Sequence, residues 1–383
     1  MNLRKYLGLS AASLAFAIPL SVSSVARAET HGYVISWFAT ATYNLDRKAS
    51  CPENRNGGRT ENYHRQLTQI GYTEAEADEI MKTQGGTLEA KYETRVATRG
   101  SVNGKPAIIY NYPESVADPN IETVVGKIAY GFDLGVKNDK MKFEDPDTHQ
   151  KIDNQLWRAV GCTHSFDTNP PDRPYFEDLT WHLMIDSAPA WSVMLTGDDL
   201  SKDGKVTITM DLLTQHLKRD AAGNVLTGAT YVIDSGPRSH NVLQGEIKNG
   251  VLSITPKDIY LEGEMPFYAE IAMHDTHMRI NMKSPDGTLS GYWGGFLDWQ
   301  RYAYMYTARP VNGQDVVGMW HALKKFADAD PDPKTGQNRM ISATWRMEAV
   351  PAFLATEEGK LVASPVPVST APQPEKVAAA PTN

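Results

Sequence analysis

The stretch HMRINMKSPDGTLSGYW, residues 277–293, decides the fold class. In its first half apolar residues alternate with polar ones, so that Met278, Ile280 and Met282 share one face of an extended chain. The sequence SPDG follows, and these residue types favour a tight turn. A second run, 288–293, leads away from the turn. The pattern predicts an antiparallel hairpin with one buried face and one face toward solvent.

Similar hairpins are expected elsewhere along the chain. The dipeptide Asn249-Gly250 joins two of the runs, and Asn-Gly is typical of two-residue hairpin turns. The other expected strands are 34–38, 179–185, 191–196, 205–210, 242–247, 251–255 and 341–350. No strand–helix–strand rhythm separates them. We therefore predict a mainly β fold, an antiparallel hairpin-built sandwich or jelly-roll-like arrangement.

Short N-terminal helices and one late C-terminal helix complete the expected elements. Helices are predicted at 60–70 and 73–82, and Thr73 with Glu76 forms a capping box at the start of the second. The late helix is predicted from an apolar stripe at helical spacing. The stripe consists of Val316, Trp320, Leu323 and Phe326.

The N-terminus has the pattern of a secretory signal peptide, residues 1–28. Arg4 and Lys5 precede the apolar stretch Leu7–Leu20, and Ala26-Arg27-Ala28 places small residues at a cleavage site. This stretch of 14 residues is too short for a membrane span, because about 20 are needed. We expect a periplasmic or secreted protein with no transmembrane segment after cleavage.

The rest of the chain divides into three parts. Residues 29–175 are expected to form a mixed α/β part, and residues 176–363 an antiparallel β domain with one helix. These two parts form either separate domains or a single one. Residues 364–383 are rich in Pro and Ala and lack aromatic residues, so a flexible tail is expected.

Charge and cysteines narrow the function. The chain has 38 Lys and Arg against 46 Asp and Glu, and an acidic chain is a poor partner for nucleic acid. Cys51 and Cys162 are the only cysteines, and an exported protein is expected to join them in a disulfide. They lie in no haem-attachment motif, and no phosphate-binding loop occurs. We expect no haem and no nucleotide cofactor.

A calcium site is one candidate for the functional centre. Asp328, Asp330 and Asp332 alternate after the late helix, and Asn338 follows. Several carboxylate and amide oxygens of this kind can converge on calcium. The spacing departs from an EF-hand, and the alternative interpretation is an acidic surface turn at the end of a helix.

Histidines provide an alternative transition-metal site. His274, Asp275 and His277 lie close in sequence, but on a regular strand the two imidazoles point to opposite faces. They could share an ion only if the chain turned between them. A less favoured function is therefore a metal-assisted periplasmic enzyme, a hydrolase or an oxidoreductase, that uses this region or the acidic loops.

The favoured function is binding of a small molecule or glycan in an aromatic groove. Residues 291–306 are rich in aromatic side chains. Trp293, Trp299 and Tyr302 are expected to line the groove, with Asp298 and Arg301 as polar contacts. The alternative is that these rings form a core stripe and bind no ligand.

Two segments resemble a group of uncharacterised exported bacterial proteins. They are KIDNQLWRAVGC at 151–162 and ADADPDPKTGQNRMISATWRMEAVPAF at 327–353. The resemblance implies no activity, cofactor or substrate. It implies that Asp153, Asn154 and the Asp328 loop belong to a shared framework.

Overall fold

The computed structural model describes most of the chain. The described residues are 28–53, 64–65, 67–68, 71–82, 100–107, 111–163, 166, 168–169, 173–174, 181–182, 185–236, 239–263, 270–307 and 316–366. The expected signal peptide lies outside them except for its last residue. Of the expected tail, only residues 364–366 are described, and Ser364 forms a parallel bridge with His31. The described residues include no helix that is long and apolar enough to cross a bilayer.

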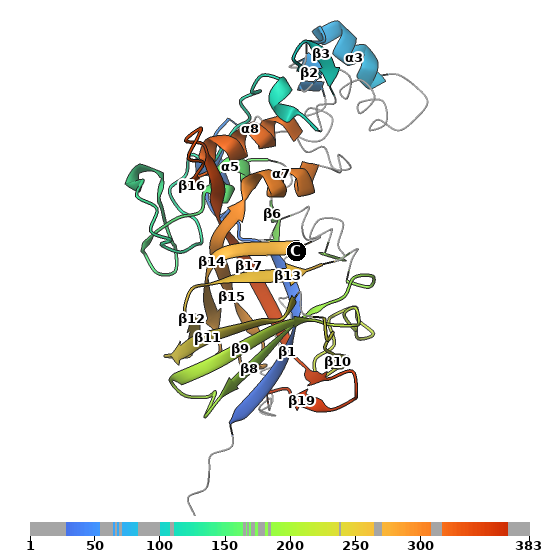
Figure 1. The fold of residues 1–383 in the computed structure, drawn as a ribbon, viewed down its shortest axis with the longest axis vertical. Coiled ribbons are helices and arrows are strands. Elements are labelled where there is room, and N and C mark those ends of the chain that lie inside the picture. Colours follow the sequence, from blue (N-terminus) through green and yellow to red (C-terminus); the bar gives the residue numbers. More distant parts are fainter. Residues whose placement is uncertain are drawn as a thin grey trace, which may run out of the picture.

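Eight antiparallel strands form a closed barrel, and they follow one another around it in chain order (Figure 1). The strands are β1 (Glu29–Thr40), β8 (Trp191–Gly197), β9 (Gly204–Leu212), β11 (Asn241–Lys248), β12 (Val251–Ile254), β14 (Glu270–Asn281), β15 (Leu289–Asp298) and β17 (Asn338–Pro351). The barrel closes because β17 pairs with β1. The mainly β, hairpin-built prediction is confirmed. The sandwich or jelly roll is replaced by a barrel, because the hairpin patterns carry no information about this last pairing.

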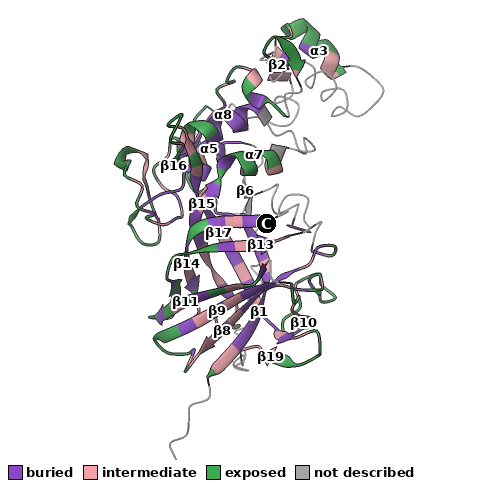
Figure 2. Ribbon diagram, in the orientation of Figure 1, coloured by how far each residue is buried: buried purple, intermediate pink, exposed green. Residues whose placement is uncertain are grey.

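Side chains fill the barrel interior. Phe38 packs there against three tryptophans, with its ring centroid 5.8 Å from that of Trp191, 5.0 Å from that of Trp293 and 6.3 Å from that of Trp345. These four aromatic residues come from four different strands and are almost completely buried. Barrels of eight strands are just wide enough for such a core. Figure 2 shows buried residues along the barrel strands and exposed residues at several hairpin ends.

Several further strands extend or flank the barrel. β13 (Lys257–Glu262) pairs with β14, and β16 (Ala329–Pro331) pairs with β17. A three-stranded sheet consists of β10 (Thr230–Val232), β18 (Phe353–Ala355) and β19 (Leu361–Ala363). Three small hairpins are β2 (Gly100–Val102) with β3 (Lys105–Ala107), β4 (Phe143–Glu144) with β5 (Lys151–Ile152), and β6 (Thr168–Asn169) with β7 (Arg173–Pro174).

Three helices gather at one end of the barrel (Figure 1). They are α5 (Gln155–Val160), α7 (Trp299–Thr307) and α8 (Val316–Phe326), and α8 contacts both others. The late helix is therefore confirmed. The other helices include α1 (Arg47–Ser50) and α3 (Glu74–Lys82), and two short 3₁₀ turns occupy Pro113–Ser115 and Asp139–Met141.

The short N-terminal helices are confirmed in part. The predicted capping box is present at α3, since Glu76 Oε2 accepts the Thr73 N–H at 2.8 Å and Thr73 Oγ1 accepts the Glu76 N–H at 3.3 Å. Residues 64–65 and 67–68 are helical, and the rest of the segment predicted at 60–70 lies outside the described residues. The strand predicted at 179–185 is wrong, because Trp181 and His182 are helical. The Ile185 N–H donates to the Trp181 carbonyl at 2.9 Å, so the apolar spacing reflects one helical turn.

Part of the 29–175 segment covers the outer face of β14 and β15. Asp145 is fully buried there, and its Oδ2 accepts hydrogen bonds from Arg279 Nη2 at 2.8 Å and from the Gly131 N–H at 3.1 Å. Burial opposes ionisation of Asp145, but these hydrogen bonds hold its pKa below the usual value. β1 itself lies between β8 and β17. Both parts of the expected division therefore contribute strands to one barrel.

The disulfide between Cys51 and Cys162 is confirmed, with an S–S distance of 2.04 Å and a sequence separation of 111 residues. Cys51 directly follows α1, and Cys162 follows α5. Arg47 Nη1 also donates to the Gly161 carbonyl at 2.9 Å. The two helix ends are therefore fastened to each other both covalently and by hydrogen bonding.

Removing this bond should destabilise the protein strongly. We expect the double substitution Cys51→Ser with Cys162→Ser to lower the free energy of unfolding by about 4 to 5 kcal/mol, because a long loop becomes unconstrained in the unfolded chain. Guanidinium unfolding without reductant measures the change. Reductant should lower the stability of the wild type and leave the variant unchanged, and a wild type that is indifferent to reductant would contradict the expectation.

Gly294 of β15 provides a test of the covering segment. A Cβ at this position would lie 2.2 Å from Cδ2 of Phe132. We expect Gly294→Ala to lower the free energy of unfolding by about 1 to 3 kcal/mol, because the Phe132 ring must move. Gly204→Ala is the matched control, since nothing lies within 4 Å of its Cβ. Equal losses in the two variants, measured by urea unfolding, would show that the ring does not pack on β15 in this way.

Candidate functional site

Two of the predicted groove residues belong to the core. Trp293 lies inside the barrel and is 1% exposed. Trp299 is equally buried, donates its indole N–H to the Asn338 carbonyl at 2.8 Å, and packs edge-on against Trp320 at 4.8 Å. For these two tryptophans the core interpretation is the one that the structure supports. Both rings are used in packing and offer no face to a ligand.

The other three predicted residues meet at a pocket at the helical end of the barrel. Asp298, Arg301 and Tyr302 line it together with side chains from β14, β15, α7 and β17. The additional lining residues are Glu270, Ile271, Ala272, His274, Leu297, Met305, Met340 and Trp345. We call this site the barrel-mouth pocket. Its volume is about 150 Å³, and most of its lining is apolar.

An ion pair lies at the edge of the barrel-mouth pocket. The Arg301 guanidinium contacts Glu270, whose side chain is only 10% exposed. Tyr260 donates its hydroxyl to Glu270 Oε2 at 3.0 Å, so the carboxylate is held from both sides. Asp298 Oδ1 accepts the Arg301 N–H at 2.9 Å in the first turn of α7. This contact is typical of a helix N-cap, and it positions Arg301.

His274 is on the rim of the same pocket, at a β-bulge. The register places His274 opposite Phe296 and His277 opposite Gly294, so three steps on β14 match two on β15. Paired residues share a face, and therefore His274 and His277 both lie on the outer face of the barrel. The expectation for a regular strand, that they point to opposite faces, is wrong because the bulge adds one residue between them.

The acidic loop does not gather its oxygens at one point. Asp330 pairs with Arg339 at 2.8 Å, and Asp332 Oδ1 accepts the Thr335 N–H at 2.9 Å. Asn338 Nδ2 donates to the Ala327 carbonyl at 2.8 Å. Over the described residues, no three His, Cys, Asp or Glu side chains stand in a preformed metal-binding arrangement. Calcium binding by this loop stays a prediction without support from the geometry.

Asp328 instead faces a cavity of about 180 Å³ that Asp153 also lines. Asp328 Oδ2 accepts the Ser342 hydroxyl at 2.6 Å, and Ser342 Oγ accepts the Gln155 N–H at 2.9 Å. Burial raises the pKa of Asp328 to about 6, and the neighbouring Asp153 carboxylate adds to this effect. Burial also raises the pKa of Asp153. These hydrogen bonds fasten α5 and the end of α8 to β17, which is a structural role.

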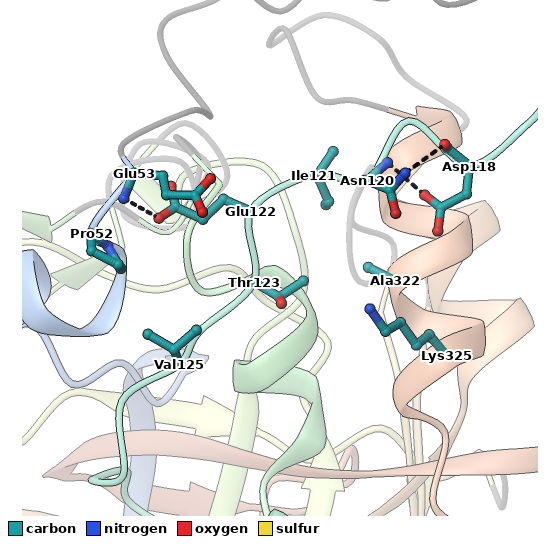
Figure 3. Close-up of a pocket in the computed structure, with 10 residues that line it drawn as sticks. All are labelled: Pro52, Glu53, Asp118, Asn120, Ile121, Glu122, Thr123, Val125, Ala322 and Lys325. Carbon is teal, nitrogen blue, oxygen red and sulfur yellow. Dashed lines mark hydrogen bonds between the residues drawn. The ribbon is translucent and has the colours of Figure 1, made fainter.

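A polar pocket lies between the segment after the disulfide and α8 (Figure 3). Figure 3 shows Glu53 beside Glu122 at one side and Asp118 beside Asn120 at the other. Glu122 Oε1 accepts the Glu53 N–H at 2.6 Å, and Asp118 Oδ1 accepts the Asn120 N–H at 2.8 Å. These carboxylates hold turns of the chain in place, and the pocket is therefore a weaker candidate for ligand binding.

Comparison of the chain with protein families, with curated proteins and with solved structures finds no match. The candidate site therefore depends on its geometry alone. Glu270, Met340 and Trp345 were not expected there, because β14 and β17 lie far from the predicted segment in the sequence. No local pattern in the sequence distinguishes them from ordinary core and strand residues.

The raised pKa of Asp328 has a measurable consequence for stability. Because its folded pKa of about 6 exceeds the unfolded value, the folded protein holds an extra proton at intermediate pH. The resulting stabilisation is present below the unfolded pKa and is lost as the pH rises through about 6. Asparagine does not titrate, so Asp328→Asn avoids this loss. As the pH rises from about 4 to about 7, we expect its free energy of unfolding to increase by about 2 to 3 kcal/mol relative to that of the wild type.

The control for this titration is Asp332→Asn, measured by urea unfolding at each pH. Backbone hydrogen bonds, first that from Thr335, lower the pKa of Asp332, so this carboxylate stabilises the fold when ionised. As the pH rises, the free energy of unfolding of Asp332→Asn should therefore decrease relative to that of the wild type. If the difference in free energy of unfolding between Asp328→Asn and the wild type stays constant with pH, the raised pKa of Asp328 is contradicted.

Proposed function

We propose that this protein binds a small apolar molecule whose hydrophobic part enters the barrel-mouth pocket. The observation that carries the proposal is the lining. Ile271, Ala272, Leu297, Met305 and Met340 surround a space of about 150 Å³. An apolar cavity of about this volume holds a molecule the size of benzene. The bound group would therefore be one ring or a short alkyl chain.

The lining favours an apolar ligand over a glycan. Sugar rings stack on exposed aromatic faces, but Tyr302 is 4% exposed and Trp345 is 2% exposed. Because both rings are almost completely buried, they form no open platform for a sugar. We therefore retain the proposal that the protein binds a small molecule, and we propose that this molecule is hydrophobic and not a glycan.

The ion pair at the edge would orient the ligand. Arg301, whose side chain is 59% exposed, lies where a ligand's polar end would meet solvent, and the buried Glu270 pairs with it. Few polar groups around an apolar pocket usually set the direction of binding. We also propose that the protein acts outside the cytosol, in the periplasm or as a secreted protein. The disulfide supports this, because such bonds persist in oxidising compartments.

Binding of benzyl alcohol tests the proposal. We expect saturable 1:1 binding by isothermal titration calorimetry, with a dissociation constant of about 1 mM or below, as for a compact ligand of few atoms. Ala272→Leu should weaken binding about tenfold or more, because added methyl groups occupy the space. Benzoate and benzylamine carry the same ring with a negative or a positive charge. Their dissociation constants show which charge the residues at the pocket edge favour.

Val251→Leu is the matched control, because Val251 lies on β12 and is 39% exposed, remote from the pocket residues. It should bind benzyl alcohol like the wild type. Equal affinities for the wild type and Ala272→Leu would place the ligand elsewhere. Absence of saturable binding for all three ring compounds would contradict the proposed function.

A further inference from the structure

The β-bulge in β14 places two imidazoles on one outer face of the barrel. Along a strand, alternate residues on one face are separated by about 6.6 Å, twice the rise per residue. His274 and His277 match Phe296 and Gly294, which are two residues apart on β15. The two histidines therefore have the spacing of a His-x-His pair on a regular strand. Such a pair can direct both imidazoles toward one ion.

The bulge is held in shape by Asp258 of β13. Asp258 Oδ1 accepts the Asp275 N–H at 3.0 Å, and Asp258 Oδ2 lies 2.9 Å from His274 Nδ1. Asp275 has a φ of 49°, the left-handed conformation that this geometry requires. With Nδ1 directed at a carboxylate, His274 has Nε2 available for a metal. A histidine that binds a metal generally gives its other ring nitrogen to such an oxygen.

Asp275, which lies between the histidines in the sequence, offers a third ligand atom. Asp275 Oδ2 is 3.9 Å from His277 Nε2, which is long for a hydrogen bond. Two ligands of a tetrahedral zinc ion are separated by about 3.3 Å, given bonds of about 2.0 to 2.1 Å. A small rotation of either side chain brings the two atoms to this separation. The carboxylate of Asp133 is also close enough to interact electrostatically with His277.

The local charge favours a cation. Asp133, Asp258 and Asp275 are the acidic groups around the two histidines, and Lys142 neutralises Asp133 through a contact of 2.6 Å. Arg279 is occupied by Asp145 and Asp147. His274 is 48% exposed and His277 is 27% exposed at the side chain, so a hydrated ion can reach both.

We propose that the bulged segment of β14 binds one Zn²⁺ or Cu²⁺ ion through His274 Nε2 and His277 Nε2, with Asp275 as an oxygen ligand and water completing the coordination. Imidazole and carboxylate ligands suit these ions. The site forms when the side chains rotate onto the metal. It does not depend on the proposed apolar ligand, although His274 also lines the barrel-mouth pocket.

Titration of the tag-free, full-length mature protein with Zn²⁺ by isothermal calorimetry tests the site. We expect one ion per chain in the wild type. His274→Gln and His277→Gln should each weaken binding about tenfold or more, because each removes one of three protein ligands. Asp275→Asn should weaken binding to a smaller extent, because Asn tolerates the left-handed conformation and keeps an oxygen.

His149→Gln is the matched control, because His149 is an exposed histidine that also pairs with a carboxylate, Glu144, at 3.1 Å. It should bind Zn²⁺ like the wild type. Thermal unfolding of each variant without metal establishes that the fold is kept. Binding that survives the double His274→Gln and His277→Gln substitution would overturn the site, and so would a wild type that binds no Zn²⁺ at 100 times the protein concentration. Benzyl alcohol binding by the same variants tests the pocket separately.

Discussion

The pairing of β1 with β17 is the constraint on which the rest of the structure depends. It joins the first and last barrel strands, and it removes both edges of the eight-stranded sheet. A closed sheet presents no unpaired edge to other chains. Closure also creates the interior that Phe38 and three tryptophans fill. Because the centre is packed, the barrel-mouth pocket lies at the end of the barrel, where Arg301 of α7 contacts Glu270 of β14.

The helical end of the molecule depends on buried carboxylates. Asp328 joins the end of α8 to Ser342 of β17, and Ser342 accepts the first N–H of α5. Asp145 joins the covering segment to Arg279 of β14. Hydrogen bonds compensate the burial of the Asp145 carboxylate and keep its pKa low, whereas at Asp328 burial outweighs the hydrogen bonds and raises the pKa to about 6.

Local patterns in the sequence predict local structure here, but they do not predict which distant strands pair. The hairpins, α8 and the capping box at α3 depend on neighbours in the chain, and all were predictable. The β1–β17 pairing was not, because no residue type marks it. Trp181 and Ile185 fit a strand or a helical turn equally well. The bulge at Asp275 depends on Asp258 across the sheet, so the common face of His274 and His277 could be seen only in three dimensions.

The disulfide also affects how the barrel is assembled. Residues 41–190 separate β1 from its neighbour β8 in the chain. Once Cys51 and Cys162 are joined, the covalent path between these strands runs only through residues 41–51 and 162–190. A shorter path lowers the entropic cost of bringing the strand ends together by about 1 kcal/mol. Oxidation thus turns residues 52–161 into a side branch of a shorter covalent connection between β1 and β8.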